Sequence, residues 1–225
     1  MFERVLEAEV MDSAEEALAY DAMDHSAVNL AFSQDVLLAC QQLAIGPAGD
    51  YLDLGTGTAL IPIQFCQLAE NTRVMAVDAA THMLDLARNN VSVAGLNERI
   101  RVANVDAKDL PFESASHDHV FSNSIVHHIP EPIDALREAW RVLAPGGLMF
   151  IRDLLRPSSA EACRQLVETY AGQETDYQQK LFADSLHAAL TVDEMRELVA
   201  EFAAPPETVQ ATSDRHWTWA MQKPE

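Results

Sequence analysis

The chain has 225 residues, of which 48% are hydrophobic and 22% charged, a composition typical of a globular protein rather than a disordered or fibrous one. Its formal net charge is −20, from 35 acidic and 15 basic side chains. Partners bound through phosphates are therefore not expected, because nucleic-acid binding depends on clustered lysine and arginine. The same charge argues against an anionic membrane surface.

The cysteines and the first residues bear on the compartment. Cys40, Cys66 and Cys163 lie far apart and form no CxxC pair, so neither a disulfide scaffold nor a zinc–cysteine cluster is expected. Acidic residues, rather than the apolar core of a signal peptide, follow Met1, and no run approaches the roughly 18 apolar residues that span a bilayer. These features predict a cytoplasmic protein.

The first 47 residues are expected to be helical. Apolar residues between Phe2 and Val10, and again between Val36 and Leu43, follow helical spacing. Gly46-Pro47 then ends the pattern.

Short apolar strands alternate with helices through residues 50–153, and Pro145-Gly146-Gly147 is expected to be the turn before the last of these strands. This alternation is typical of a parallel sheet covered by helices on both faces. The expected strands lie at residues 51–54, 74–77, 100–103, 119–122 and 148–151, and the expected helices at 59–69, 83–91 and 133–143.

The alternation is interrupted at residues 157–190, where two helical patterns predict an inserted helical cap. A helix through 192–202 and two strands, 207–212 and 216–221, follow. Only three residues separate these strands, and a parallel crossover needs a dozen or more, so they must form an antiparallel hairpin. The predicted fold is therefore a doubly wound α/β fold with a seven-stranded, mostly parallel sheet.

A glycine-rich turn follows the first strand. Asp53 precedes Gly55 and Gly57, and such a turn lets the backbone approach a ligand at the carboxyl edge of the sheet. A GxGxxG dinucleotide fingerprint would need glycine where the chain has Leu60. Asp53 can accept from a cationic or amino group, although the turn could also be only a tight strand–helix joint.

Acidic residues also follow the next two strands. Asp78 ends the second strand, where an acid can accept from both hydroxyls of a ribose or can cap the following helix. Asp106 follows the third strand, where it could accept from an adenine amino group or serve as a turn residue.

Five segments follow one another in the chain: DLGTGTA at 53–59, VD at 77–78, DAKDLPF at 106–112, HDHVFSN at 117–123 and RVLAPGG at 141–147. In this order they resemble the class I S-adenosylmethionine-dependent methyltransferases, and most closely the small-molecule branch that includes the quinone-biosynthesis methyltransferases. The resemblance covers about residues 48–153 and implies a Rossmann-like fold.

The resemblance implies a cofactor, S-adenosyl-L-methionine, with S-adenosyl-L-homocysteine as product. The first loop would cradle its methionine part, the second would hold the ribose, the third would lie beside the adenine, and the end of the fourth strand would face the transferred methyl. Ala59 stands where many members have glycine. The implied cofactor-binding residues are Asp53, Gly55, Thr56, Gly57, Asp78, Ala79, Asp106, Ala107 and Asn123.

The resemblance also divides the chain into an N-terminal helical lid, residues 1–47, and a methyltransferase domain, residues 48–225, with its helical cap. In many members the segment before the sheet folds over the cofactor, so Tyr20 and His25 are candidate catalytic residues that could close the site; otherwise they belong to a packed, capped helix start.

Five histidines and two arginines remain. His127 or His128 could act as a general base, or could be packing groups. His117 and His119 lie on one face of a strand without a further ligand, so no metal site is expected. Candidates for substrate binding are Arg152, Arg215 and His216, whose alternatives are a strand-end ion pair and a surface turn.

The function predicted is methyl transfer to a small-molecule acceptor through nitrogen, oxygen, carbon or sulfur, small thiols included. The alternatives are a nicotinamide-dependent oxidoreductase on a Rossmann fold and a methyltransferase-like protein that only binds a ligand. Leu60 and the terminal hairpin argue against the oxidoreductase.

Overall fold

The structure, a computed structural model, describes residues 2–7 and 13–225. Its α-helices are α1 (Ala14–Asp21), α2 (Ser26–Gln42), α3 (Leu60–Leu68), α4 (Thr81–Val93), α5 (Pro132–Val142), α6 (Ala160–Ala171), α7 (Asp176–Ala188) and α8 (Val192–Val199). Three short 3-10 helices are η1 (Val126–His128), η2 (Ala200–Phe202) and η3 (Pro206–Thr208). The strands are β1 (Gly49–Leu54), β2 (Thr72–Asp78), β3 (Ile100–Asn104), β4 (His117–Asn123), β5 (Leu143–Leu154), β6 (Val209–Ala211) and β7 (His216–Gln222).

The strands of the described residues form one sheet in the order β3-β2-β1-β4-β5-β7-β6. β1 pairs in parallel with β2 and β4, and β2 with β3. β6 and β7 pair antiparallel, with Val209 opposite Trp219. The predicted fold class, a doubly wound and mostly parallel seven-stranded sheet with a C-terminal hairpin, is confirmed.

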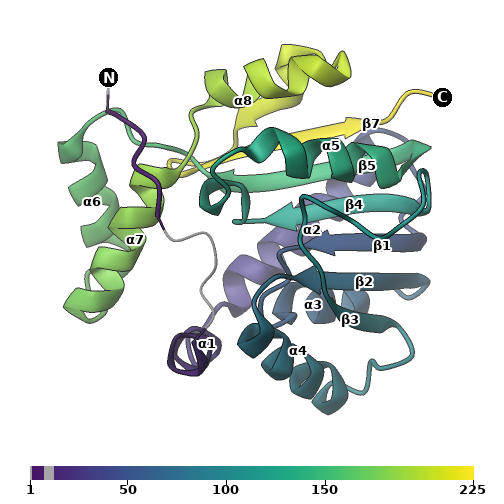
Figure 1. Cartoon of the computed structure of the whole chain (residues 1–225), viewed down its shortest axis with the longest axis horizontal. Coiled ribbons are helices and arrows are strands. Elements are labelled where there is room, and N and C mark those ends of the chain that lie inside the picture. Colours follow the sequence, from purple (N-terminus) through teal and green to yellow (C-terminus); the bar gives the residue numbers. More distant parts are fainter. Residues whose placement is uncertain (1, 8–12) are drawn as a thin grey trace. The chain divides into compact units, whose positions relative to one another are not determined.

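The helix expected at the start of the chain is wrong for residues 2–7, which have no regular secondary structure; Val10 lies outside the described residues. The reason is that the hydrogen-bond donors of this segment bind carbonyl groups elsewhere in the chain. The backbone N–H of Val5 donates to the carbonyl of His187 at 3.0 Å, and the Arg4 guanidinium donates to that of Ala188 at 2.7 Å. The segment therefore runs alongside α7 instead of coiling on itself (Figure 1).

β5 is longer than expected, because Pro145-Gly146-Gly147 belongs to the strand and is not a separate turn. The N–H of Gly146 donates to the carbonyl of Lys223 at 2.8 Å, and the N–H of Lys223 to that of Gly147 at 2.9 Å. These bonds to the chain after β7 hold the segment extended.

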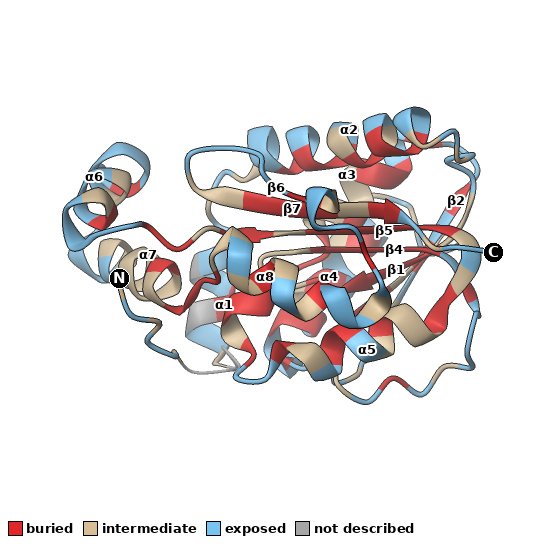
Figure 2. Cartoon of the chain, turned by 90° about the horizontal axis from the view of Figure 1, so that it is seen from above, coloured by how far each residue is buried: buried red, intermediate tan, exposed pale blue. Residues whose placement is uncertain are grey.

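The described residues divide into two compact units that do not follow chain order. The first comprises residues 2–7, 124–132 and 152–219, and the second residues 13–123, 133–151 and 220–225. In the second unit, α2 and α3 lie on one side of β1 and β4, and α4 and α5 on the other (Figure 2). Its main apolar core includes Phe32, Phe65 and Phe121, all buried.

The first unit contains the helices expected for the cap. Ser159 caps α6, and a capping box of Thr175 and Gln178 begins α7. Their apolar faces join a smaller cluster that includes Cys163 and Leu186 and against which Phe2 packs. Cys40, Cys66 and Cys163 are all buried and free. No described helix is long and apolar enough to cross a membrane.

Candidate functional site

In the second unit, the glycine loop that leaves β1 is held against β2. The backbone N–H groups of Gly55 and Thr56 both donate to the carbonyl of Val77 at 2.9 Å. Gly55 and Gly57 have φ angles of 71° and 54°, in the left-handed region that favours glycine. The loop is thereby shaped within the chain, with its turn at the carboxyl edge of parallel strands.

Beneath the loop lies an unsatisfied acid. Asp53 is 2% exposed, and its Oδ2 atom has no hydrogen-bond partner among the described residues. Burial raises the pKa of its carboxyl to about 7; the Thr56 hydroxyl lies close enough to oppose the rise, and the charge of Asp78 adds to it. The Thr56 Oγ1 atom is likewise buried without a hydrogen bond of good geometry. The base of the loop thus holds a buried carboxyl beside a buried hydroxyl, and a polar ligand group at this place could satisfy both.

Asp78, at the end of β2, is already engaged with backbone. Its Oδ2 atom accepts from the N–H of Gly57 and its Oδ1 atom from the N–H of Ala80, both at 2.8 Å. Asn104 of β3 holds the start of the next loop by donating to the carbonyls of Asp78 and Ala79 at 3.1 and 2.9 Å.

Tyr20 lies next to the loop. A Cβ atom added at Gly57 would lie 4.0 Å from the Tyr20 Cε1 atom. The Tyr20 ring stacks on His25 with centroids 4.5 Å apart, and 40% of Tyr20 remains exposed. Asn90 of α4 donates to Asp21 Oδ1 at 2.8 Å and to the carbonyl of Thr58 at 3.1 Å. Asn90, which sequence reasoning missed, therefore ties the end of α1 to the loop.

The loop after β3, which contains Asp106, is more exposed to solvent. Asp106 accepts from the backbone N–H of Lys108 at 2.9 Å and pairs with its ammonium at 3.0 Å, which accords with the turn-residue alternative. Ala107 beside it is buried, and Asn123, at the end of β4, is partly buried. The nine residues predicted to bind a cofactor, together with Tyr20 and His25, all belong to the second unit.

The first unit holds a separate cluster around η1. Asp153, 1% exposed, accepts from the Nδ1 atom of His127 at 2.5 Å. On its other side, the His127 Nε2 atom lies 3.4 Å from Glu7 Oε1, and His128 Nδ1 lies 3.1 Å from the same oxygen. Sequence reasoning did not single out Glu7, and no motif in the residues around it indicates a functional role.

The charges in this cluster shift one another. Burial alone would raise the pKa of Asp153 and lower that of His127. Their mutual attraction and hydrogen bond outweigh burial, so the pKa of Asp153 is lowered and that of His127 raised. Burial raises the pKa of Glu7. The predicted catalytic roles of His127 and His128 stay predictions.

The structure brings the three predicted substrate residues close together within the first unit. Burial lowers the pKa of His216 to about 4, and the charges of Arg215 and Arg152 act in the same direction. Arg152 donates to the Thr218 hydroxyl at 3.1 Å, and the Arg215 guanidinium stacks 3.4 Å from the Tyr170 ring centre. Both arginines are thus fixed by contacts within the unit.

His117 and His119 have structural partners. His117 Nδ1 lies 3.0 Å from the Ser116 hydroxyl, and His119 Nδ1 accepts from the backbone N–H of Leu148 at 3.1 Å. The structure gives them packing roles within the sheet.

Comparison with known proteins gives one family match: residues 52–151 match the model described as a methyltransferase domain. Two curated relatives are 27-O-demethylrifamycin SV methyltransferase of Amycolatopsis mediterranei, 28% identical over 181 residues, and demethylmenaquinone methyltransferase of Deinococcus radiodurans, 33% identical over 121 residues. The matches cover 78% and 54% of this chain, and 62% and 49% of those proteins. The chain thus spans between about half and two thirds of the relatives' length.

The fold is shared with solved structures. That of the plantazolicin methyltransferase BpumL, in complex with a monoazolic desmethylPZN analog and SAH, has a TM-score of 0.72 to this chain, with 15% sequence identity. The similarity covers 93% of this chain and 90% of BpumL. At this identity the likeness shows the fold alone.

Proposed function

We propose that the chain, whose residues 52–151 match a methyltransferase domain, is a class I S-adenosylmethionine-dependent enzyme that transfers a methyl group from S-adenosylmethionine to a small-molecule acceptor. The resemblance read from the sequence motifs is thereby confirmed at the level of family and fold.

The observation that carries the proposal is the buried Asp53 carboxyl, whose Oδ2 atom accepts no hydrogen bond of good geometry from the described residues, next to the buried hydroxyl of Thr56. The amino and carboxylate groups of a bound methionine moiety can satisfy both. The polar groups of this loop therefore fit S-adenosylmethionine. A dinucleotide fits less well, because Leu60 stands at the third glycine of its fingerprint.

In the proposed reaction the protein aligns the acceptor with the cofactor and shields both from water. When bound, the cofactor supplies a sulfonium methyl that an acceptor nucleophile takes in an in-line displacement, leaving S-adenosylhomocysteine. Asp53 would hold the amino group, the backbone of Gly55 and Gly57 the methionine part, and Asp78 with Ala79 the ribose. Asp106 and Ala107 would border the adenine, and Asn123 would face the methyl. Alignment of this kind supplies most of the catalysis when the nucleophile is already reactive.

Tyr20 and His25 are proposed to cover the site. Their stacked rings lie at the end of α1, and the Tyr20 ring is in van der Waals range of a side chain built at Gly57. An aromatic cover excludes water from a displacement reaction without taking part in proton transfer.

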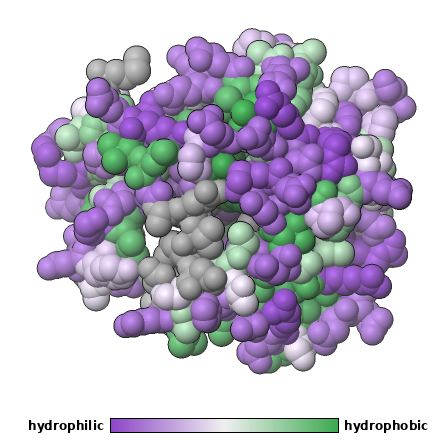
Figure 3. Space-filling view, viewed as in Figure 1, coloured by the Kyte–Doolittle hydropathy of each residue, from purple (hydrophilic) through white to green (hydrophobic). Residues whose placement is uncertain are grey.

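The acceptor is proposed to be a small molecule in the cytoplasm, methylated on nitrogen, oxygen, carbon or sulfur. The net charge of −20 opposes polyanionic substrates, and hydrophilic residues dominate the face drawn in Figure 3. The buried free thiols accord with a reducing compartment. Arg152, Arg215 and His216 are proposed to contact the acceptor, since the positive field of the two arginines would favour an acidic group.

Calorimetry with S-adenosylhomocysteine and, separately, NADH tests the cofactor assignment. We expect saturable one-to-one binding of the first and none of the second; binding of NADH alone would replace this proposal with the oxidoreductase. A screen of small thiols, amines, phenols and quinone precursors, read out as S-adenosylhomocysteine formed, then identifies the acceptor.

A further inference from the structure

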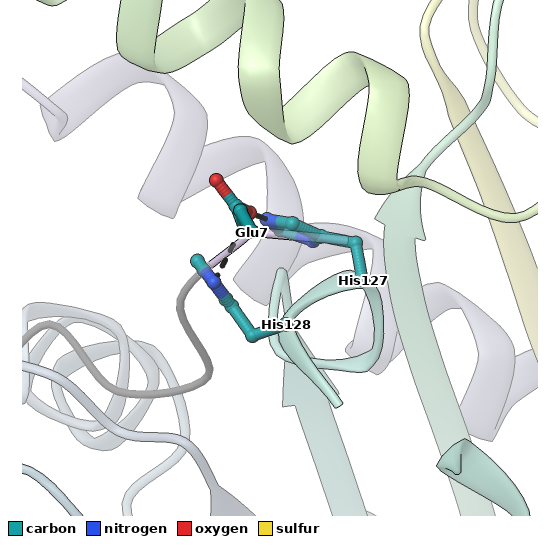
Figure 4. Close-up of side chains that lie close together, drawn as sticks. All are labelled: Glu7, His127 and His128. Atoms are coloured by element: carbon teal, nitrogen blue, oxygen red, sulfur yellow. Dashed lines mark ion pairs between the residues drawn. The ribbon is translucent and has the colours of Figure 1, made fainter. Parts of the chain in front are cut away.

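Three metal-ligating atoms from two distant stretches of the chain converge in the first unit. Glu7 Oε1, His127 Nε2 and His128 Nδ1 all lie within 4.8 Å of one another (Figure 4). The carboxylate oxygen is the shared point, 3.1 Å from the His128 nitrogen and 3.4 Å from the His127 nitrogen. Both rings turn a nitrogen toward Glu7.

These separations suit a tetrahedral metal ion. Zinc binds histidine nitrogen and carboxylate oxygen at about 2.0–2.2 Å, which places two ligand atoms of a tetrahedron about 3.4 Å apart. The two nitrogen–oxygen distances observed are at or near this value, so an ion could be bound with small side-chain adjustments.

Asp153 provides a carboxylate behind the His127 ring, on the side away from Glu7. It accepts from His127 Nδ1 at 2.5 Å and also from the backbone N–H of Val126 at 2.5 Å, which fixes both the ring and the loop that carries it. A proton on Nδ1 leaves the Nε2 lone pair directed at Glu7. Metal-binding histidines typically show this arrangement, in which a carboxylate holds the nitrogen that does not face the metal.

We propose that Glu7, His127 and His128 bind a divalent transition-metal ion, with zinc the ion that best suits two imidazoles and one carboxylate. Magnesium and calcium prefer all-oxygen sites. The His128 and Glu7 side chains are 22% and 15% exposed, so water can reach a fourth position. This is the ligand count of zinc sites that keep one position open.

The ion would have a defined effect on this unit. It would join the N-terminal segment 2–7 to η1, in addition to the bonds already made by Arg4, whose guanidinium donates to the carbonyl of Ile129 at 3.0 Å. It would also occupy the imidazole lone pairs, giving both histidines a role other than that of general base. The inference does not rest on methyl transfer, and binding of the metal alone tests it.

The experiment uses the untagged 225-residue protein, freed of metal by a chelator and titrated with Co²⁺ as a spectroscopic probe and with Zn²⁺ in competition with a chromophoric chelator. We expect one equivalent of Co²⁺ to give visible absorption bands of a tetrahedral or five-coordinate site. Zn²⁺ should displace it. His128→Ala and Glu7→Gln should each weaken binding at least tenfold, and Asp153→Asn about 10–100-fold.

Matched controls are Glu3→Gln, on the same N-terminal segment, and His82→Ala, an exposed histidine of α4. Both should bind as the parent does, and circular dichroism should show that every variant is folded. Absence of a saturable one-to-one cobalt spectrum would overturn the proposal, and so would equal loss of binding in the variants and the controls. A folded His128→Ala protein that keeps full affinity would also overturn it.

Discussion

The backbone N–H of Gly57 donates to the Oδ2 atom of Asp78 at 2.8 Å, so the acid at the end of β2 also holds the tip of the glycine loop. The proposed ribose contact and the proposed methionine contact are therefore not independent. A change at Asp78 alters both the charge offered to the ribose and the position of the loop.

For this reason Asp78→Ala should weaken binding of S-adenosylhomocysteine by about 1.5–3 kcal/mol, the usual effect of losing hydrogen bonds to a charged acceptor. Calorimetry on the purified variant measures it. Asp85→Ala, at an exposed acid of α4, is the control and should bind normally. Unchanged affinity in a folded Asp78→Ala protein would show the ribose assignment to be wrong.

Two substitutions at Gly57 should distinguish the effect of backbone strain on ligand binding from the effect of side-chain volume. The residue has a φ of 54°, where any side chain costs about 1–2 kcal/mol, but an added Cβ meets only the Tyr20 ring, at 4.0 Å. Gly57→Ala should therefore fold and bind weakly, whereas Gly57→Val, with its two further methyls, should not bind. Thermal unfolding and calorimetry on the pair check this; equal binding by both would place the ligand elsewhere.

Cofactor affinity should depend on pH through Asp53. Burial raises the pKa of its carboxyl to about 7, so below that pH the free protein holds it neutral. A bound ammonium favours the carboxylate, and binding then releases a proton. Affinity for S-adenosylhomocysteine should rise, by at most about tenfold per pH unit, as pH increases toward about 7, and level off above it.

The Asp53→Asn variant supplies the control for this rise, which it should abolish. It should also remove a stability change in the ligand-free protein. Unfolding releases the proton of Asp53 between about pH 4 and 7, so this acid makes the folded state less stable as pH rises through that range. Affinity that falls with rising pH in the parent would rule out the carboxylate–ammonium contact.

Stability of the first unit should depend on Glu194. This residue closes the capping box of α8 with Thr191 and pairs with Arg156, whose side chain is 3% exposed. Glu194→Ala leaves a buried guanidinium without its counter-charge and should destabilise the protein by about 3–5 kcal/mol. Glu197→Ala, at an exposed acid of the same helix, should change stability by less than about 0.5 kcal/mol. Chemical denaturation measures both, and similar values for the two would refute the assignment.

Nucleic acids should not bind. At a net charge of −20 the protein should give no gel shift with tRNA or duplex DNA, even at low ionic strength. A shift that disappears on adding salt would contradict the proposal of a small-molecule acceptor.

The second unit could be predicted from the sequence because its signals are local. Asp53, the glycines and Asp78 each follow a short apolar strand, and parallel strands bring their carboxyl ends to one edge. The order and spacing of these motifs were therefore enough to predict which residues lie at the same edge of the sheet. Asn90 is different, because its bonds to Asp21 and Thr58 depend on how α1 lies against α4.

The first unit was harder to predict because its contacts join distant parts of the chain. The spacing of Phe2, Val5 and Leu6 satisfies a helix, but the segment finds its hydrogen-bond partners on residues far along the chain, among them His187. No local pattern shows that Glu7 faces His128. The second unit has one such case: the sequence of Gly146 and Gly147 is typical of a turn, but their hydrogen bonds to Lys223 make them part of a strand.

Ala59 lies directly before α3 with a φ of 62° and is completely buried. A residue with a Cβ atom pays about 1–2 kcal/mol for this left-handed conformation, so the packing around the buried Ala59 must hold the turn between Gly57 and α3 in place. The conformational entropy of the turn is then lost when the chain folds and not when the ligand arrives. A cofactor bound at this loop, as proposed above, would therefore meet a turn that the fold has already ordered.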